Sequence, residues 1–566
     1  MKYDDILKEL GEFGPYQKRL YVLLCIPMVS LGIQIMVTVF TMGVPDHRCA
    51  VPDLDNDTYL IQGEEHAHAV NASIPAADEG TQLYSSCHLY GVINNSRTGA
   101  LQISNTTHSC NRWVYDYEAF GANIVTTFDW VCDKKLYKSH IQMMFMLGSL
   151  VGCIVVVPPA DFIGRKKMFM LGILFHIVAS ISMAFAPSFA VFTSLMFFNG
   201  MSSTAIWMNG FVVGVELVGP SKRRWTGIIV ELFWSAGYFI AVGAAYFIRD
   251  WQHLQLVLSV PTVLFLAYYW FIPESPRWLI TKRKYEMAKG ILQRAAKVNK
   301  VTLSSDLFSG KVLDSTKSEP IWKIFTSLTL LSRCVIVFIN WLVCSLGYYG
   351  LGLNVASLGG SVYANGLIAG TTEVVSYIAC ILLLDRTGRK SLHCVSMILG
   401  GICCTATMFP VLYGAGGLTW LTITLALVGR AFVSASFAIV WLYTSELFPT
   451  VIRNSTMSVA NVCGRLGGVI SPYIANLALV IPGDFGRAVP LIIFGASMVG
   501  AGLLALLLPE TLNKELPESL EDAVKMKSRK GSSGASHVDF VRSGKDDEMF
   551  HLRAVCDSES EDDPSA

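Results

Sequence analysis

Long apolar stretches dominate this chain, and their number and length limit the folds that it can adopt. Hydrophobic residues make up 52% of its 566 residues and charged residues 15%, whereas an ordinary soluble domain has about 25% charged residues. Stretches of about 20 apolar residues are long enough to cross a bilayer as helices. We expect about twelve such spans, at 20–42, 139–159, 168–187, 190–214, 226–247, 253–272, 332–353, 362–384, 391–413, 418–443, 455–480 and 487–508.

A short charged motif occurs twice. Asp161-Phe162-Ile163-Gly164-Arg165-Lys166 follows one apolar stretch, and Asp385-Arg386-Thr387-Gly388-Arg389-Lys390 follows another. Such a duplication is typical of secondary transporters, in which two bundles of helices rock against each other around a central site. The sequence therefore predicts an all-α membrane protein with two pseudo-symmetric six-helix bundles, at 20–272 and 332–508.

Basic residues beside the apolar stretches predict the topology. They fall on alternate connections, which the positive-inside rule assigns to the cytoplasm. Both termini are then cytoplasmic, at 1–19 and in a disordered tail at 509–566, and a linker at 273–331 joins the bundles through short helices. The net charge of +1 gives no reason to expect a nucleic-acid partner, so the lipid bilayer is the expected surrounding.

One polar insertion, at 43–137, follows the first span on the side that the charge bias places outside the cell. It contains four Asn-x-Ser/Thr sequons, which predict a glycoprotein, at Asn56, Asn71, Asn94 and Asn105. It also contains Cys49, Cys87, Cys110 and Cys132. An even number of cysteines in an oxidising compartment predicts two disulfides, but three connectivities fit the sequence equally well.

Several longer motifs resemble those of one transporter family. The resemblance covers about residues 3–522 and rests on the N-terminal segment 3–17, His47-Arg48-Cys49, Phe128 to Cys132, Pro273 to Leu279, Gly347 to Leu351, Tyr443 to Asn454 and Leu508 to Lys514. These motifs resemble the organic cation, carnitine and organic anion transporters (solute carrier family 22) of the major facilitator superfamily. The segment Ala245 to Trp251 is most similar to the cation and carnitine branch. The resemblance implies a plasma-membrane carrier that works by alternating access, is not an enzyme and functions as a monomer.

Four ionisable residues fall inside the expected spans: Glu231, Glu373, Arg430 and Arg465. A charge at the bilayer centre costs about 2.5–3.5 kcal/mol on insertion scales, so such residues are expected to face a cavity or a partner. Aromatic residues that could complete a substrate cavity are Trp341, Tyr348, Tyr349 and Tyr377. The alternatives are helix packing for the aromatic residues, gating or snorkelling for Glu231, and a permanent acidic partner for Arg465.

Arg465 bears most on the substrate class. The resemblance implies that carriers devoted to cations have Asp at this place, whereas carnitine and anion carriers have Arg; anion carriers often have Lys at the place of Tyr377. The combination with Glu373 is therefore similar to a pattern for small zwitterions, with the carboxylate at Arg465 and the amine near Glu373 and the tyrosines. The alternatives are an organic anion exchanger and a non-transporting glycoprotein that retains the fold, because Val157 and Met196 depart from the family pattern.

A second charged set, the gate residues, lies at the cytoplasmic ends of the spans. The resemblance implies ion pairs between the bundles that break when the inside opens, with Asp161 beside Arg165, Glu216 beside Arg223 or Arg224, Asp385 beside Arg389, Glu446 beside Arg453, and Glu274 beside Arg277. Gly164 and Arg386 complete the set. A purely topogenic role is the alternative for its cations.

No cofactor is expected apart from a coupling ion. The membrane potential supplies about 2.3 kcal/mol per 100 mV to a monovalent cation, but a zwitterion gains nothing net and needs sodium, protons or exchange. Gln34 and Asn209 are candidate oxygen ligands for sodium. Which ion couples, if any, is open at this point.

Overall fold

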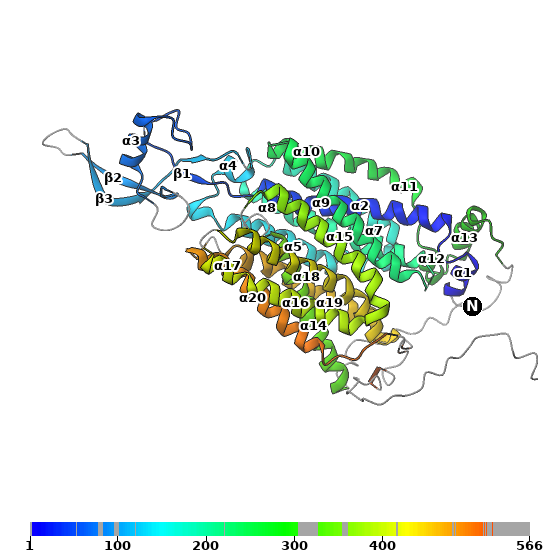
Figure 1. Cartoon of the computed structure of the whole chain (residues 1–566). Coiled ribbons are helices and arrows are strands. Elements are labelled where there is room, and N and C mark those ends of the chain that lie inside the picture. Colours follow the sequence, from blue (N-terminus) through cyan, green and yellow to red (C-terminus); the bar gives the residue numbers. More distant parts are fainter. Residues whose placement is uncertain are drawn as a thin grey trace, which may run out of the picture. The chain divides into compact units, whose positions relative to one another are not determined.

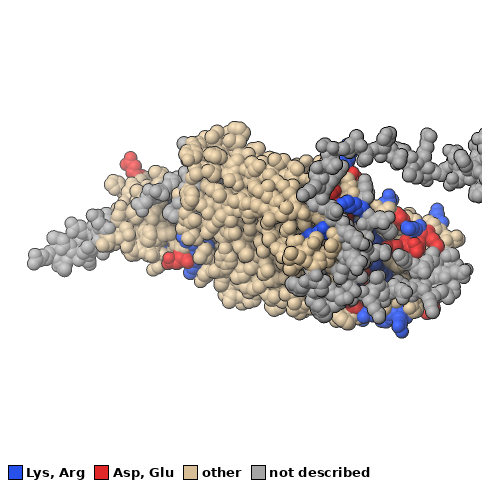
Figure 2. Space-filling model, turned by 90° about the horizontal axis from the view of Figure 1, so that it is seen from below, with Lys and Arg blue, Asp and Glu red and all other residues tan. Residues whose placement is uncertain are grey.

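A computed structural model describes most of the chain: residues 3–52, 54–76, 83–94, 101–118, 120–219, 221–303, 327–353, 360–414, 417–477, 480–481, 483–512, 514, 517 and 523–524. Within these residues, eleven helical segments are long and apolar enough to cross a membrane. Figure 2 shows a belt of uncharged residues between two groups of charged ones, as expected of a multi-pass membrane protein. Most of the predicted tail, 509–566, lies outside the described residues.

The spans form two bundles (Figure 1). The first half contains α2 (Pro15–Thr41), α5 (Tyr137–Val155), α6 (Ala160–Ile163), α7 (Arg165–Met183), α8 (Phe189–Glu216), α9 (Arg223–Phe247) and the segment made of α10 (Trp251–Ser259), the 3₁₀ helix η2 (Val260–Ala267) and α11 (Tyr268–Phe271). The second half contains α14 (Leu328–Leu353), α15 (Val362–Thr387), α16 (Arg389–Ala406), α17 (Met408–Tyr413), α18 (Thr419–Leu447), α19 (Thr450–Ala475) and α20 (Gly483–Ala505).

Corresponding helices pack in the same way in the two halves. The first and fifth helices are neighbours in each half, as α2 with α9 and α14 with α19, and so are the second and fourth, as α5 with α8 and α15 with α18. Glycine allows the close approach of the first and fifth helices: a Cβ on Gly32 would lie 2.2 Å from the carbonyl oxygen of Trp234, and one on Gly467 would lie 2.1 Å from that of Leu342. The predicted duplication is therefore confirmed as a repeated packing pattern.

Within the described residues, eleven of the twelve expected spans are long and apolar enough to cross a membrane, and the exception is α19. It has 26 residues and takes the place of the predicted span at 455–480, but it is not among the apolar helices. Asn461, Gly464 and Arg465 on this helix line an internal cavity. The polar face of α19 is thus turned toward the protein interior, where a membrane helix can carry polar groups.

The insertion after α2 is a folded unit with its own apolar cluster around Cys49, Val70 and Cys110. Strand β1 (His47–Cys49) pairs antiparallel with β4 (Trp113–Tyr115), and β2 (His88–Asn94) pairs antiparallel with β3 (Leu101–Ser109). The insertion also contains α3 (Glu64–Ser73), α4 (Ile124–Phe128) and the 3₁₀ helix η1 (Cys132–Lys134). The all-α prediction holds for the membrane part but missed these two small sheets.

Covalent and ionic contacts hold the insertion together. The structure joins Cys49 to Cys110 and Cys87 to Cys132, which selects one of the three connectivities that the sequence left open. Arg48 is 2% exposed and donates to Oδ2 of Asp57 over 3.0 Å. Burial by itself would raise the pKa of Asp57, but the hydrogen bonds from Arg48 and from the backbone of Val51 hold it below its ordinary value.

Short helices at the opposite end of the bundles were only partly predicted. The linker forms α12 (Pro276–Thr281) and α13 (Tyr285–Asn299), as expected, and residues 304–326 of it lie outside the described part. The N-terminal segment, for which no helix was predicted, forms α1 (Tyr3–Glu9). Apolar residues of α1 pack on those of α12 and α13, including Ile6, Leu7, Trp278 and Leu292. We call this end of the bundles the duplicated-loop end, because it carries both copies of the charged motif. We call the opposite end the insertion end.

Candidate functional site

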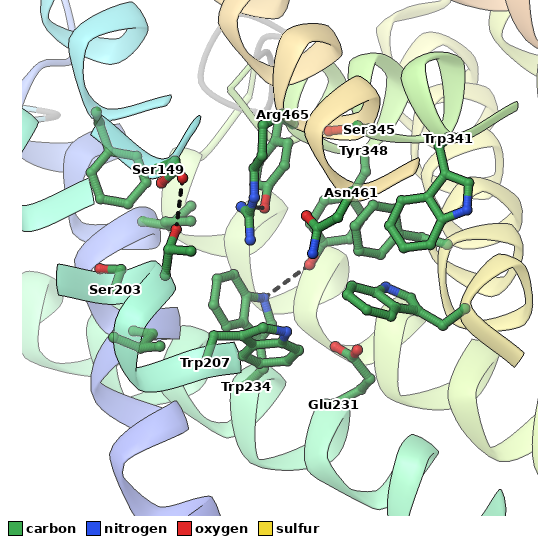
Figure 3. A pocket seen from close by; sticks show the side chains of 18 residues that line it. Ser149, Ser203, Trp207, Glu231, Trp234, Trp341, Ser345, Tyr348, Asn461 and Arg465 are labelled. Atoms are coloured by element: carbon green, nitrogen blue, oxygen red, sulfur yellow. Dashed lines mark hydrogen bonds between the residues drawn. The ribbon is translucent and has the colours of Figure 1, made fainter. Parts of the chain in front are cut away.

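A cavity lies between the two halves, and both halves supply its walls. Its empty volume, which includes space open to solvent, is about 640 Å³. Aromatic residues supply much of the wall (Figure 3): Phe145, Trp207, Trp234, Trp341, Tyr348, Tyr349, Phe437 and Trp441. The eighteen lining residues include one acid, Glu231 from α9, and one base, Arg465 from α19.

Arg465 reaches the cavity without an acidic partner. Its Nη1 donates to the hydroxyl of Tyr349 over 3.2 Å, and within the described residues it forms no ion pair. Its Nε is buried and has no hydrogen-bond partner in the same part of the chain, as is also true of Nε1 of Trp441. The permanent acidic partner that was the alternative for Arg465 is therefore not found in this conformation. A guanidinium with an unused donor can bind a planar carboxylate through two parallel hydrogen bonds.

Glu231 faces the same cavity from the first half. It is 6% exposed, and among the described residues it has neither a hydrogen bond nor an ion pair. Trp234, one turn further along α9, lies next to it in the wall, and its ring meets that of Trp207 edge-on at 5.4 Å. Figure 3 shows the side chains of Glu231 and Arg465 entering from different helices, with Asn461 between them.

Glu373, Arg430 and Tyr377 do not line this cavity but form a buried cluster behind Tyr348. Oε1 of Glu373 accepts hydrogen bonds from the hydroxyls of Tyr348 and, over 3.0 Å, of Tyr377. Its Oε2 lies 3.6 Å from Nη2 of Arg430. Glu373 is 0% exposed and Arg430 2% exposed. Two of the four predicted intramembrane charges thus neutralise each other. The sequence-based prediction placed Glu373 and Tyr377 directly at the substrate, whereas in this structure neither residue lines the cavity.

Tyr348 connects that cluster to the first half. Its hydroxyl accepts a hydrogen bond from Nε1 of Trp234 over 2.9 Å and lies 3.4 Å from the hydroxyl of Tyr238. The guanidinium of Arg430 also lies over the ring of Tyr238, at 5.6 Å from its centroid. A chain of polar contacts therefore runs from α9 through Tyr348 to the charge pair, so the position of the cavity wall depends on the buried cluster.

Sequence reasoning placed Trp341, Tyr348, Tyr349, Glu231 and Arg465 near a site, and the structure brings all five to one cavity. It missed several lining residues, namely Trp207, Trp234, Phe437, Trp441 and Asn461. A signal for them was present: Asn461 is four residues before Arg465, Trp234 three after Glu231, and Phe437 and Trp441 are four apart. Residues three or four apart share a helix face, so the faces of the charged residues could have been searched.

The duplicated loops have similar contacts in both halves. In the first half, Arg165 forms an ion pair with Glu216, which accepts a hydrogen bond from Oγ of Ser275 over 2.7 Å. Glu274 accepts from the backbone N–H of Lys166 over 3.0 Å. Gly164 has a φ of +117°, and a Cβ there would lie 2.5 Å from Oε2 of Glu274, so only glycine fits.

The second half repeats this arrangement. Nε of Arg389 lies 3.1 Å from Oε2 of Glu446, which accepts from Oγ1 of Thr511 over 2.7 Å. Glu510 accepts from the backbone N–H of Arg389 over 2.9 Å, and Gly388 has a φ of +90°. Pro509-Glu510-Thr511 thus corresponds to Pro273-Glu274-Ser275. The predicted gate residues include Glu274 but not its counterpart Glu510, although the sequence shows both Pro-Glu-Ser/Thr motifs.

These contacts correct the predicted gate pairs. Glu216 pairs with Arg165 and not with Arg223, which instead pairs with Asp4 of α1 at 2.5 Å. Glu446 pairs with Arg389, whereas Nε of Arg453 donates to the carbonyl of Phe448. Arg277 and Arg386 are exposed, and the side chain of Arg224 lies outside the described residues.

In this conformation the ion pairs brace each half separately. Arg165 also lies 3.4 Å from Asp161 and Arg389 3.8 Å from Asp385, again within one half. Besides the bond from Trp234 to Tyr348 at the cavity, hydrogen bonds between the halves include two at the insertion end. There, His140 Nδ1 lies 2.8 Å from the hydroxyl of Tyr473, and Arg249 donates to the hydroxyl of Tyr363 over 3.0 Å. The inter-bundle gate that the resemblance implies remains a prediction for another conformation.

Replacing Glu446 by glutamine is expected to destabilise the second half by about 1.5–3 kcal/mol, because Arg389 loses its closest carboxylate. The matched control is Asp385→Asn, since Asp385 is more distant and its side chain is 44% exposed; its expected effect is below about 1 kcal/mol. Thermal melting of the detergent-solubilised variants measures the difference. Equal melting temperatures for the two variants would refute the bracing role of Glu446.

The remaining predicted residues lie away from the cavity. Asn56 and Asn71 are exposed on the insertion, and the side chains of Asn94 and Asn105 lie outside the described residues. The oxygen of Gln34 accepts a hydrogen bond from Gln255 over 3.1 Å. Nδ2 of Asn209 donates to the carbonyl of Ala205 over 2.8 Å. Glycosylation and ion coupling therefore stay predictions.

Comparison with known proteins identifies the family. A family model described as "Sugar (and other) transporter" matches residues 90–522, more than half of the chain. The Drosophila melanogaster organic cation transporter protein is 35% identical over 92% of this chain and 94% of its own length. The human organic cation/carnitine transporter 2 is 29% identical over 96% of this chain and 98% of its own length. The Mus musculus solute carrier family 22 member 3 is 32% identical over 93% of this chain and 96% of its own length. The chain belongs to solute carrier family 22 of the major facilitator superfamily.

A solved structure shows the same fold. The xylose transporter XylE from E. coli, in a partially occluded inward open conformation, has a TM-score of 0.57 and 15% sequence identity, and the match covers 88% of this chain and 100% of XylE. The predicted major facilitator architecture is therefore confirmed. Members of this family are membrane transporters and not enzymes.

Proposed function

We propose that this protein is a plasma-membrane transporter that moves small organic zwitterions or cations of the carnitine type by alternating access. The observation that carries the proposal is Arg465, a guanidinium that lines an aromatic cavity and has no acidic partner among the described residues. Leaving such a group without a counter-ion is unfavourable in a membrane interior, so a ligand carboxylate is its natural partner. The aromatic walls suit an alkylated ammonium group.

The position of the cavity supports alternating access. Its lining comes from both halves, so a rotation of one half against the other would open it to either side of the membrane. The contacts between His140 and Tyr473 and between Arg249 and Tyr363 would have to break for opening at the insertion end. Because disulfides form in oxidising compartments, we place the insertion outside the cell and both termini in the cytoplasm. One chain contains the whole cavity, which supports function as a monomer.

The driving force depends on the substrate. A monovalent cation would enter down the membrane potential, whereas a zwitterion carries no net charge and requires coupling to sodium, to protons or to exchange. Uptake must therefore be measured with and without sodium. Sodium-independent carnitine uptake would remove Gln34 and Asn209 from consideration as sodium ligands.

The decisive experiment is uptake of carnitine, tetraethylammonium and an aromatic carboxylate into oocytes, normalised to surface expression, for the wild type and Arg465→Asp. We expect the substitution to reduce carnitine uptake about 100-fold, because it replaces a bidentate partner of the carboxylate by a like charge. Tetraethylammonium uptake should be retained or increased, and this shows that the variant is folded.

Other outcomes identify the alternatives. Uptake of the aromatic carboxylate alone would indicate an organic anion exchanger. No uptake of the three compounds by a wild-type protein at the cell surface would support a non-transporting glycoprotein that retains the fold. Equal carnitine uptake by the wild type and Arg465→Asp would show that Arg465 does not bind the carboxylate.

A further inference from the structure

Two intramembrane acids could bind the positive end of a substrate, and the structure separates their roles. Glu373 is completely buried, and its Oε1 accepts hydrogen bonds from the hydroxyls of Tyr348 and Tyr377. Its Oε2 has no hydrogen bond within the described residues but forms an ion pair with Arg430 at 3.6 Å. Tyr348 stands between this carboxylate and the cavity, because it lines the cavity while its hydroxyl donates to Glu373. A substrate cation would have to displace Arg430 or Tyr348 to reach it.

Glu231 has the opposite properties. It lines the cavity, only 6% of its surface is exposed, and its carboxylate has no partner among the described residues. A buried carboxylate without a counter-charge is unfavourable, so the site is incomplete until a cation arrives. The rings of Trp207 and Trp234 lie in the same wall, and their faces attract an alkylated ammonium group.

The charges are also divided between the halves. Glu231, Trp207 and Trp234 come from α8 and α9 of the first half, whereas Arg465, Tyr349 and Trp441 come from α14, α18 and α19 of the second. Nε of Arg465 and Nε1 of Trp441, two buried donors without a hydrogen-bond partner among the described residues, both lie in the second half. A ligand with one charge satisfies only one wall of the cavity.

We propose that Glu231 binds the positively charged end of the substrate while Arg465 binds its carboxylate, so that a zwitterion bridges the two halves. Glu373 is a positioning residue that holds Tyr348 in the wall. The assignment rests on the proposed function and deepens it, since it selects zwitterions over simple cations. It also gives a reason for substrate-dependent closure, because only a ligand with both charges draws the two halves together.

The test compares carnitine with its carba analogue, in which a carbon atom replaces the quaternary nitrogen and the carboxylate is unchanged. Competition with labelled carnitine, and the thermal shift that each compound causes in purified protein, are measured for the wild type, Glu231→Gln and Glu373→Gln. The wild type should prefer carnitine to the analogue about 10- to 100-fold. Glu231→Gln should abolish this preference by weakening carnitine binding alone, and Glu373→Gln should retain it even if the protein is less stable.

Each other result has a defined meaning. A preference that survives in Glu231→Gln, or that is lost in Glu373→Gln and kept in Glu231→Gln, overturns the assignment but leaves the transport proposal intact. Loss of the preference in both variants shows that Glu373 shares the binding role and also overturns it. A wild type that responds to neither compound, by uptake or by thermal shift, overturns both proposals.

Discussion

Replacing Arg430 by alanine is expected to destabilise the protein by about 3–5 kcal/mol, because it leaves Glu373 buried without its counter-ion. The two groups lie 3.6 Å apart and are 2% and 0% exposed, so water cannot take the place of the guanidinium. The substitution also removes a cation from beside the rings of Tyr238 and Tyr348. Surface expression and thermal melting of the solubilised protein measure the loss.

A double replacement distinguishes a structural pair from a substrate contact. Arg430→Met combined with Glu373→Gln removes both charges, and we expect it to recover most of the stability lost in the single variant. Arg386→Ala, at an exposed position on α15, is the matched control and should melt like the wild type. A stable Arg430→Ala protein that had lost only substrate binding would contradict the pairing and return Arg430 to the substrate site.

Replacing Gly200 by alanine is the second change with a large expected effect. A Cβ at this position would lie 1.9 Å from the carbonyl oxygen of Phe145 on α5, and one on Gly148 would lie 2.0 Å from that of Phe197 on α8. Both obstacles are backbone atoms, which cannot repack as a side chain can. We expect a loss at or above the upper end of the usual range for overpacking, about 3 kcal/mol, and little protein at the cell surface.

The close contact between α5 and α8 also positions part of the cavity wall. Oγ of Ser149 donates to the carbonyl of Gly200 over 3.1 Å, and Oγ1 of Thr204 donates to the carbonyl of Ser149 over 3.1 Å. Ser149 and Thr204 both line the cavity. Gly243→Ala in α9 is the control, because a Cβ there meets nothing within 4 Å and alanine favours a helix. Equal surface expression of the two alanine variants would show that α5 and α8 can separate at no cost.

The sequence predicted the membrane class, the order of the spans and the duplication with good accuracy. These properties depend on local composition, since a run of about 20 apolar residues can satisfy its backbone in lipid only as a helix. This holds even where proline interrupts the helix: the spans expected at 253–272 and 391–413 are found at Trp251–Phe271 and Arg389–Tyr413. Pro261 lies in the 3₁₀ helix η2 between α10 and α11, and Pro410 lies in α17, after the break at Thr407. The sheet of β1 and β4 was missed because its two strands lie far apart in the sequence. The hairpin of β2 and β3 was missed as well.

The candidate site was likewise predicted only in part from the sequence. The sequence alone determined that four intramembrane charges need a cavity or a partner, because placing a charge in lipid is unfavourable. These are Glu231, Glu373, Arg430 and Arg465. Which of them are partners of each other depends on how α9, α15, α18 and α19 pack. Only the tertiary structure decided that Glu373 faces Arg430 while Glu231 and Arg465 face the cavity, because ion pairing is set by distances between helices that lie far apart in the sequence.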